Sequence, residues 1–410
     1  MAGRFCAAPY RASSARKHTV NDRVSSGFAG VQPKLFRKTR NRWLAYASEL
    51  ASPVLRLAAS VKARGPATPR AQWRKGLILG HTHIGDVLYR TCSLPMLREH
   101  LPHVEWSYAV SPGSAEVLEG NPHIAEVLPV IRGENSWDLI EGGFAQLASR
   151  EFDVVLCSNS LRHHPDLGLS TALGIPNRFA FSGKGFSALI NYPVAMGFPD
   201  SYSSYFRTMV ASAIERPPDW PLRPRLHPSE DDETRAATLF TSLGLSPEKA
   251  VVACSLGTRQ ARGNWPDDVL LAILENARAR FDFDIVFTGV EPDAARLESI
   301  ASDFRYPVRV LAGGARLLTF AAFLKRCAAI LTLDSGPRHI GNAMGVPVLF
   351  ARNLSHSMKE AGQYCETETD LAPPVEYLND TETDRVAQSQ PVGLLADKLL
   401  AKLSASGSRA

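Results

Sequence analysis

Three short segments of the chain combine residue types that could carry out chemistry. The first, residues 80–88, contains two histidines, a glycine and an acid: His81, His83, Gly85 and Asp86. Asp86 stands at the expected start of a helix, where it could accept a proton from an attacking hydroxyl group as a general base. The helix dipole alone would also favour an acid there, so both interpretations stay open. Two histidines without a third ligand do not predict a metal site.

The second segment, residues 333–339, reads Leu-Asp-Ser-Gly-Pro-Arg-His between an apolar run and a helical pattern. Ser335 suits a helix N-cap, Pro337 suits the first helical turn, and Gly336 allows the backbone to approach a ligand closely. A helix N-terminus with free amides attracts anions, so this segment could bind a diphosphate, with His339 adding a hydrogen bond or a positive charge. The alternative is an ordinary strand–turn–helix junction whose cap residues serve only the helix.

The third segment, residues 255–266, reads Ser-Leu-Gly-Thr-Arg-Gln-Ala-Arg-Gly-Asn-Trp-Pro and follows another short apolar run. Arg259 and Arg262 could clamp phosphate oxygens with their planar guanidinium groups. Trp265 and Pro266 are typical of the entrance to a helix. A solvated basic loop is the alternative interpretation of this segment.

The elements that must position these segments alternate between apolar runs and helical patterns from residue 75 onward. Strands are expected at Gly76–Leu79, Val104–Val110, Glu126–Val130, Val154–Cys157, Arg178–Phe181, Val251–Ser255, Asp284–Thr288, Val308–Val310, Ala329–Thr332 and Val346–Phe350. Helices are expected at Asp86–Glu99, Trp137–Arg150, Asp267–Ala279, Asp293–Ser302, Leu318–Lys325 and Arg338–Met344. This alternation predicts an α/β protein with two doubly wound domains. Ligands bind beyond the carboxyl ends of such strands, so the site is expected in the cleft where the two domains face each other.

Composition divides the chain into five predicted parts. Residues 1–74 form a basic extension, expected to be largely disordered apart from one short amphipathic helix. Residues 75–216 form the N-terminal domain, and the proline-containing stretch 217–247 is the predicted linker. Residues 248–400 form the C-terminal domain, and residues 401–410 are a tail. A chain of 410 residues is long enough for two separate cores.

Charge is distributed unevenly between the extension and the rest of the chain. Residues 1–75 hold 16 Lys and Arg against two acids, Asp22 and Glu49, for a net charge of +14. The remaining residues carry 30 bases and 39 acids, for a net charge of −9. The basic character therefore does not belong to the folded body, which argues against a nucleic-acid-binding core.

The amphipathic stretch of the extension carries apolar residues at helical spacing. These residues are Trp43, Ala47, Leu50, Val54, Leu57 and Val61. Pro53 interrupts the pattern and should end or kink the helix. One interpretation is a peripheral contact with an anionic membrane surface. The other is a tail helix that packs on the body, or a loose solvated arm.

Several functional classes lack their sequence signatures. There is no GxGxxG after either first strand, no GxxxxGK[ST] and no GxSxG. We identify no Asp-x-Asp triplet of the kind that metal-dependent transferases use, which predicts a reaction without a metal or other cofactor. The six cysteines form no CxxC pair and are interpreted as reduced thiols of a cytoplasmic protein. No apolar run is long enough to span a bilayer.

Taken in order, the three segments resemble glycosyltransferase family 9, the ADP-heptose:lipopolysaccharide heptosyltransferases. Residues 85–88 (GDVL) with 94–97 (LPML) are similar to the opening segment of the family. Residues 258–266 are similar to its phosphate loop, which ends in Trp-Pro. Residues 333–339 with 343–347 are similar to its D-[ST]-G-P-x-H signature, the most specific of the three matches. The resemblance covers about residues 75–360.

This resemblance implies the GT-B fold, in which two Rossmann-like domains bind the acceptor N-terminally and the nucleotide C-terminally. It implies that Asp86 is the general base of an inverting reaction, beside an acceptor-side loop with His81, His83 and Gly85. The resemblance also implies a donor site with more residues than the acceptor-side loop. Its members are Thr258, Arg259, Arg262, Glu291, Asp334, Ser335, Gly336, Pro337 and His339.

Two positions depart from the family pattern. The family usually has a lysine two residues before the tryptophan, where this chain has Gly263, and Arg262 is the predicted replacement. After Phe350 the family often continues Gly-Pro-Thr, where this chain has Ala351-Arg352-Asn353.

The predicted function is therefore the metal-independent, inverting transfer of a sugar to a glycan hydroxyl. The expected donor is ADP-heptose, and the expected acceptor is a lipid-linked glycan of the lipopolysaccharide type. The expected location is the cytoplasm, at the cytoplasmic face of the inner membrane. Two alternatives stay open: a nucleotide-sugar epimerase on the same architecture, and a non-catalytic protein that binds a nucleotide sugar.

Overall fold

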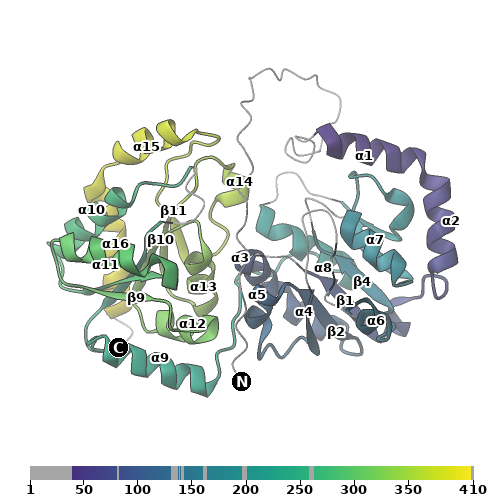
Figure 1. Ribbon diagram of the computed structural model, residues 1–410, viewed down its shortest axis with the longest axis horizontal. Helices are drawn as coiled ribbons and strands as arrows, with labels where there is room; N and C mark the ends of the chain where they lie inside the picture. The colour runs from purple at the N-terminus through teal and green to yellow at the C-terminus, as the bar shows by residue number, and fades with distance from the viewer. Residues whose placement is uncertain are drawn as a thin grey trace.

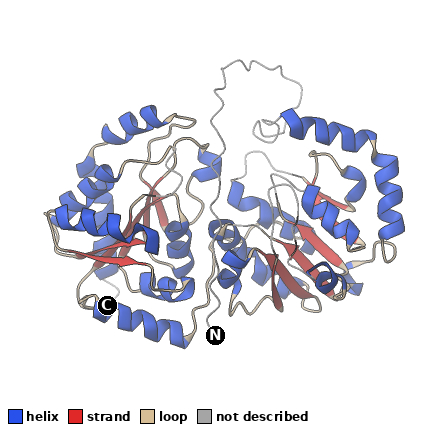
Figure 2. Cartoon of the chain, in the orientation of Figure 1, coloured by secondary structure: helices blue, strands red, loops and turns tan. Residues whose placement is uncertain are grey.

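The computed structural model contains two α/β domains, which lie beside each other in Figure 1. It describes residues 39–80, 83–130, 137, 139, 143–159, 164–195, 201–257 and 263–407. Of the residues singled out above, His81, Thr258, Arg259 and Arg262 lie outside these ranges. In both domains helices surround a central sheet (Figure 2).

The N-terminal domain is built on a six-stranded parallel sheet with the order β3-β2-β1-β4-β5-β6. Its strands are β1 (Lys75–Leu79), β2 (Glu105–Val110), β3 (Glu126–Pro129), β4 (Val154–Cys157), β5 (Asn177–Phe181) and β6 (Tyr192–Val194). The strand order reverses between β1 and β4, and that reversal is the switch point where such sheets bind ligands.

The C-terminal domain repeats this plan with the order β12-β11-β10-β7-β8-β9, again all parallel. Its strands are β7 (Val251–Ser255), β8 (Asp284–Gly289), β9 (Val308–Ala312), β10 (Ala329–Leu333), β11 (Val348–Ala351) and β12 (Glu368–Asp370). The switch point here lies between β7 and β10. The predicted architecture of two doubly wound α/β domains is confirmed.

The helices pack on both faces of these sheets. In the extension and the N-terminal domain they are α1 (Thr39–Leu50), α2 (Ser52–Lys62), α3 (Ile84–Leu88), α4 (Leu94–His100), α5 (Pro112–Ala115), α6 (Gly143–Ala148), α7 (His164–Ala172) and α8 (Tyr205–Ile214). Beyond them the chain forms α9 (Glu230–Ser242), α10 (Asp267–Arg278), α11 (Ala294–Asp303), α12 (Leu317–Lys325), α13 (Gly336–Met344), α14 (Met358–Ala361), α15 (Asp380–Gln388) and α16 (Val392–Gly407).

The helix expected over Asp86–Glu99 is divided in the structure. It consists of α3, a 3₁₀ segment η3 (Tyr89–Ser93) and α4. Pro95 explains the second boundary, because proline is accommodated in the first turn of a helix and not in its interior. Of the helix expected over Trp137–Arg150, the described part is α6, and several of its other residues lie outside the described ranges.

The predicted linker contains ordered structure. Ser229 and Asp232 form a capping box at the start of α9, in which the Ser229 hydroxyl accepts a bond from the Asp232 amide. Asp232 is buried and also accepts a hydrogen bond of 2.7 Å from the Thr319 hydroxyl of α12. The helix α9 thus packs on the C-terminal domain, while the proline-rich residues before it connect the two domains.

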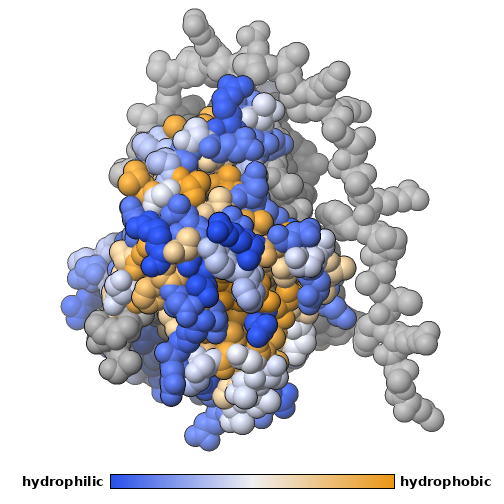
Figure 3. All heavy atoms as spheres, turned by 90° about the vertical axis from the view of Figure 1, so that its left-hand side faces the viewer, coloured by the Kyte–Doolittle hydropathy of each residue, from blue (hydrophilic) through white to orange (hydrophobic). Residues whose placement is uncertain are grey.

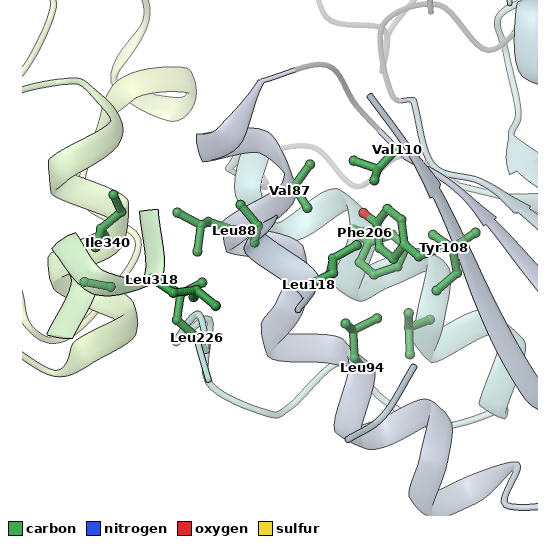
Figure 4. Close-up of a cluster of buried hydrophobic side chains, with 14 of the residues drawn as sticks. Val87, Leu88, Leu94, Tyr108, Val110, Leu118, Phe206, Leu226, Leu318 and Ile340 are labelled. Carbon is green, nitrogen blue, oxygen red and sulfur yellow. The ribbon is translucent and has the colours of Figure 1, made fainter. Parts of the chain in front are cut away.

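One apolar cluster joins the two domains. It includes Leu88 and Leu118 of the N-terminal domain, Leu226 of the connection, and Leu318 and Ile340 of the C-terminal domain. These side chains lie close together in Figure 4. Two further clusters fill the opposite faces of the sheets. Because burial of shared apolar surface stabilises contact between domains, this cluster fixes which edges of the sheets meet.

Polar contacts accompany this junction. The Arg316 guanidinium, just before α12, donates to Glu116 over 2.7 Å and also to Glu119. Glu116 begins the 3₁₀ segment that follows α5, and Glu119 is the residue just after that segment. The amide of Leu318 donates to the same Glu116 carboxylate over 2.9 Å. Both carboxylates raise the pKa of Arg316. The start of α12 is therefore held against the N-terminal domain by charge as well as by apolar packing.

Candidate active site

The two domains bring the carboxyl ends of β1 and β10 together. The helix α3 follows β1, and α13 follows β10, each beside the switch point of its sheet. A Cβ atom at Gly85 would lie 2.6 Å from Cδ2 and 2.9 Å from Nε2 of His339. The imidazole of α13 therefore rests directly on the backbone of α3, and any side chain at Gly85 would displace it. The sequence had predicted both residues for the site, and the structure places them in contact.

Asp86 lies one residue further along α3 and is partly buried. The Tyr89 hydroxyl donates a hydrogen bond of 2.8 Å to its Oδ1 atom. Buried Arg90 lies near this carboxylate and donates to the Ser158 carbonyl oxygen over 3.1 Å. Burial, the largest effect, would lower the pKa of Arg90, but Tyr89, Tyr108 and Asp86 together raise it. Asp86 is therefore a carboxylate that is oriented by a phenol and attracted by a buried cation.

His339 lies between Asp86 and an aromatic side chain that the sequence analysis did not identify. Its Nδ1 atom is 2.7 Å from the Tyr364 hydroxyl, and the two rings stack with centroids 5.5 Å apart. Tyr89 approaches the same imidazole edge-on at 6.4 Å. Burial, followed by the charge of Arg338, lowers the pKa of His339. If the Tyr364 hydroxyl donates to Nδ1, the neutral ring carries its proton on Nε2, the atom nearer Gly85.

The N-terminus of α13 presents amide groups next to open space. Ser335 is the N-cap residue, as predicted, with an extended backbone of φ −148° and ψ 179°. Its hydroxyl makes no bond to a helix amide, however, and is instead 3.1 Å from the Thr332 hydroxyl. A Cβ atom at Gly336 would meet no atom within 4 Å, and Pro337 has no amide hydrogen. The start of α13 therefore offers a helix dipole and, beside Gly336, space for an anion.

A buried network holds α13 in place. Arg338 is 1% exposed and donates to both oxygens of Glu368, over 2.8 and 2.9 Å. It also donates to Asp334 over 2.7 Å and to the carbonyl oxygens of Ala361 and Gly362. Burial alone would raise the pKa of Glu368, but the hydrogen bonds and charge of Arg338 hold it below its ordinary value. Asp334 is thus held against Arg338 at the start of α13.

Glu368 connects this network to Tyr364. Its Oε1 atom accepts the backbone amide of Tyr364 over 2.5 Å, and its Oε2 atom accepts the amide group of Asn342 over 2.8 Å. Arg338 of α13 therefore holds Glu368, and Glu368 holds the backbone of Tyr364, the tyrosine that contacts His339. No pattern in the sequence pairs these residues, because they are separated by more than 20 positions along the chain.

The loop after β7 is described only at its two ends. Before it, Gly257 has a φ of +59°, and a Cβ atom there would lie 2.7 Å from the Arg296 guanidinium. Arg296 also donates to the Leu256 carbonyl oxygen over 2.9 Å and pairs with Asp267 at 2.5 Å. Arg296 is a cation next to this loop that sequence analysis missed.

After the loop, Gly263 has a φ of +75°, a conformation that favours glycine. A Cβ atom there would lie 2.5 Å from Oδ1 of Asn353 and 2.6 Å from Cβ of Ser355. Its amide donates to Asp380 over 2.8 Å, and its carbonyl oxygen accepts the amide of Leu354 over 2.9 Å. A lysine does not fit at this position. The two departures from the family pattern, at Gly263 and at Asn353, are therefore in contact with each other.

Two predicted residues lie at the periphery of this arrangement. Glu291 is exposed just beyond the end of β8. Its Cβ atom would lie 2.8 Å from a Cβ atom added at Gly313. It is thus on the ligand-binding edge of the C-terminal sheet. His83 is exposed at the start of α3, and its carbonyl oxygen accepts the Val87 amide over 3.1 Å.

The sequence analysis was wrong to find no Asp-x-Asp triplet, because residues 282–284 form one. Asp282 and Asp284 lie at the amino end of β8, whereas Glu291 follows the carboxyl end of the same strand. Both carboxylates pair with Lys249, at 3.1 and 2.7 Å. Among the described residues there is no group of three or more His, Cys, Asp or Glu side chains arranged to bind a metal.

Comparisons with known proteins agree with this arrangement. Residues 168–355 match the family model for glycosyltransferase family 9 (heptosyltransferase). A family 9 glycosyltransferase from Veillonella parvula has a similar structure at 17% sequence identity, with a TM-score of 0.65 over 82% of this chain and 98% of the other. No curated protein matches the chain by sequence.

Two further solved structures come from E. coli. ADP-heptose lps heptosyltransferase II is 18% identical, with a TM-score of 0.61 over 80% of this chain and 98% of the other. Heptosyltransferase WaaC, solved with ADP, is 17% identical, with a TM-score of 0.61 over 80% and 99% of the two chains. At this level of identity the likeness establishes the fold, which is the predicted GT-B arrangement.

Proposed function

We propose that this glycosyltransferase transfers heptose from ADP-heptose to a glycan hydroxyl with inversion, starting from the match of residues 168–355 to the family 9 heptosyltransferase model. The acceptor is a lipid-linked glycan of the lipopolysaccharide type, and no metal ion takes part. The single observation that carries the proposal is the contact between Gly85 and His339, because it places the helix that bears Asp86 against the helix whose N-terminus is the proposed diphosphate site.

Asp86 is the proposed general base. The acceptor oxygen attacks the anomeric carbon of the sugar from the face opposite the leaving group, so the configuration inverts. As the new carbon–oxygen bond forms, the hydroxyl proton passes to Asp86, and the bond between the anomeric carbon and the diphosphate oxygen breaks. The hydrogen bond that Tyr89 donates to Oδ1 orients the Asp86 carboxylate for this step. General-base catalysis of this type contributes a factor of about a hundred or more.

The leaving nucleoside diphosphate gains negative charge, which α13 is proposed to stabilise. The start of α13 has open space beside Gly336, and the dipole of the nine-residue helix points the same way. An uncharged His339 would add a hydrogen bond from Nε2. Each preorganised donor of this type contributes roughly 3 kcal/mol at the transition state. In this proposal these groups act in place of a metal ion, with Thr258, Arg259 and Arg262 as further phosphate ligands.

The choice of ADP-heptose rests on the similar proteins. WaaC has been solved with ADP and with ADP-2-deoxy-2-fluoro heptose, and heptosyltransferase II is named for ADP-heptose. In this chain the exposed Glu291 at the end of β8 is the proposed contact of the nucleoside. A lipid-linked acceptor also implies that the enzyme works as a peripheral protein at the cytoplasmic face of the inner membrane.

A nucleotide panel tests the donor site. Thermal unfolding is followed with ADP, UDP, GDP and CMP and with the matching sugars, all in the presence of EDTA. The proposal predicts that ADP and ADP-heptose raise Tm and that the chelator has no effect on the shift. A shift with another diphosphate would change the donor, and a shift that EDTA abolishes would contradict the metal-free mechanism. Conversion of the bound sugar without any acceptor would instead favour an epimerase.

A further inference from the structure

Exposed apolar side chains are concentrated on α1 and α2. Thirteen large apolar side chains are exposed in the described part of the chain, and seven of them belong to these two helices: Trp43, Leu44, Tyr46, Leu50, Val54, Leu57 and Val61. The other six are scattered over the two domains. On the outer face of the C-terminal domain, for example, polar and apolar residues are interspersed (Figure 3). A contiguous exposed apolar patch on a folded protein marks an interaction surface.

The two helices are amphipathic in the opposite sense to a packed surface helix. The side that faces the N-terminal domain carries mostly small or polar residues, such as Ala45, Ser48 and Ala59, and Leu55 is the large apolar residue that packs on the core there. The side that faces away carries the large apolar residues. We call Trp43, Tyr46, Leu50, Val54, Leu57 and Val61 the outer stripe, and their exposed fractions range from 55 to 85%. Packing on the domain would bury the large residues first, so the outer stripe is not explained by the fold.

The helices are firmly attached, so this exposure does not come from a loose arm. The Ser48 hydroxyl accepts the Phe186 amide over 2.8 Å, and Glu49 accepts both the amide and the hydroxyl of Ser187. The Arg64 amide donates to the Gly174 carbonyl oxygen over 3.1 Å just after α2. These contacts hold the middle and the C-terminal end of the helix pair against the N-terminal domain. Figure 1 shows α1 and α2 at the outer side of that domain.

Charge indicates what the outer stripe contacts. Arg56 and Lys62 are exposed on α2, whereas the guanidinium of Arg64, which follows them, donates to the Phe152 carbonyl oxygen. The one acid of the two helices, Glu49, is already engaged with Ser187. Residues 1–75 as a whole carry 16 bases against two acids. A second copy of such a surface would be repelled, whereas an anionic surface would be attracted. Bases beside exposed Trp and Leu are the combination that binds lipid headgroups and the adjoining acyl chains.

We propose that the outer stripe of α1 and α2 inserts into the interface of an anionic lipid bilayer, with Arg56 and Lys62 contacting lipid phosphates. The N-terminal domain, which is the proposed acceptor domain, is thereby held at the membrane that carries the acceptor. This part rests on the proposed function. Membrane binding itself depends on neither Asp86 nor α13, so the two proposals fail separately.

Flotation with vesicles tests the surface on the full-length chain. Vesicles of phosphatidylethanolamine and phosphatidylglycerol are compared with vesicles of phosphatidylcholine, without donor or acceptor. The wild-type chain is expected to partition into the anionic vesicles at least about tenfold more strongly. The double variant Leu50→Glu/Leu57→Glu should lose at least about tenfold of this partitioning. The variant Leu394→Glu changes an apolar residue of α16 that is 61% exposed, and it should bind like wild type.

Brominated lipids report insertion directly, because they quench the fluorescence of a tryptophan that lies within the bilayer. Quenching is expected for the wild-type chain and should be lost in Trp43→Phe. Equal vesicle binding by wild type and by the Leu50→Glu/Leu57→Glu variant would overturn the proposal, since the basic residues alone would then account for it. An absence of vesicle binding would also overturn the proposal. So would a concentration-dependent dimer that the same double variant dissociates, because the outer stripe would then be a protein interface. Unchanged ADP-induced stabilisation in the double variant keeps this result separate from the donor site.

Discussion

The two sides of the candidate site are built differently. On the C-terminal side, α13 is anchored by a fully buried ion pair between Arg338 and Glu368, with hydrogen bonds to the loop that carries Tyr364. On the N-terminal side, Asp86 lies on the five-residue helix α3 and accepts a hydrogen bond from the neighbouring Tyr89. The difference teaches that the proposed diphosphate site is preorganised by buried charge, while the base depends on how α3 packs against His339.

The largest expected effect comes from breaking the buried pair. The variant Arg338→Met leaves Glu368 as an uncompensated buried carboxylate and frees the Ala361 and Gly362 carbonyl oxygens. Loss of one partner of a buried pair costs about 3–5 kcal/mol of unfolding free energy. Chemical denaturation measures this loss. The control Arg235→Met removes an exposed pair with Asp231 and should cost less than about 1 kcal/mol. Equal effects of the two variants would contradict the anchoring role of Arg338.

The next effect tests the contact between the two sides. In Gly85→Ala, the new Cβ atom would lie 2.6 Å from His339, so the imidazole or α3 must shift. We expect transfer activity to fall roughly tenfold to a hundredfold, because displacement of about 1 Å is enough for such a loss. Gly113→Ala in α5 is the matched control, since a Cβ atom there meets nothing within 4 Å. Wild-type activity in Gly85→Ala would separate His339 from the reaction.

A smaller effect is expected at the start of α13. Gly336→Asp places a negative charge where the diphosphate is proposed to bind, at a position with free space around it. ADP affinity should fall by roughly tenfold, as expected for one unfavourable charge contact. Stability should stay the same or rise slightly, because an acid favours a helix N-terminus. Gly393→Asp in the first turn of α16 is the matched control, and calorimetric titration with ADP compares the two.

The smallest effect concerns pH. Burial holds the pKa of His339 below its ordinary value, so between that pKa and about 6.5 the unfolded chain binds more protons than the folded one. Stability should therefore fall as pH drops below about 6.5. His123 and His227 have lowered pKa values for the same reason and contribute similarly. The variant His339→Gln should show a smaller drop in Tm between about pH 7.5 and 5.5 than wild type. An identical drop would mean that His339 is not buried as a neutral ring.

The sequence predicted the strands well for a physical reason. Parallel strands that are covered on both faces read as continuous apolar runs, and β4 and β7 were predicted with their observed bounds. The short strands β6 and β12 were missed, because three residues with a proline or with two acids give no such run. The division of residues 84–100 into α3, η3 and α4 was also missed, since a helical pattern continues across all three.

For the site, the sequence predicted what local chemistry determines. Asp86, His339 and the N-cap at Ser335 follow from residue types beside strand ends, and the structure places His339 against Gly85, the neighbour of Asp86. Tyr364 and Glu368 could not be found in this way, because their roles depend on partners about 25 to 30 residues away. The contact between Gly263 and Asn353 likewise depends on a positive φ and a tertiary approach that no local pattern reveals.

Asp86 provides the most direct test of the whole account. The variant Asp86→Asn keeps the shape of the side chain and its contact with Tyr89, but it removes the proposed base. Release of ADP from ADP-heptose is measured with an inner-core lipopolysaccharide acceptor, and ADP binding is measured in parallel. The account predicts that transfer falls about a hundredfold or more while ADP affinity is unchanged. Full transfer activity in this variant would contradict it.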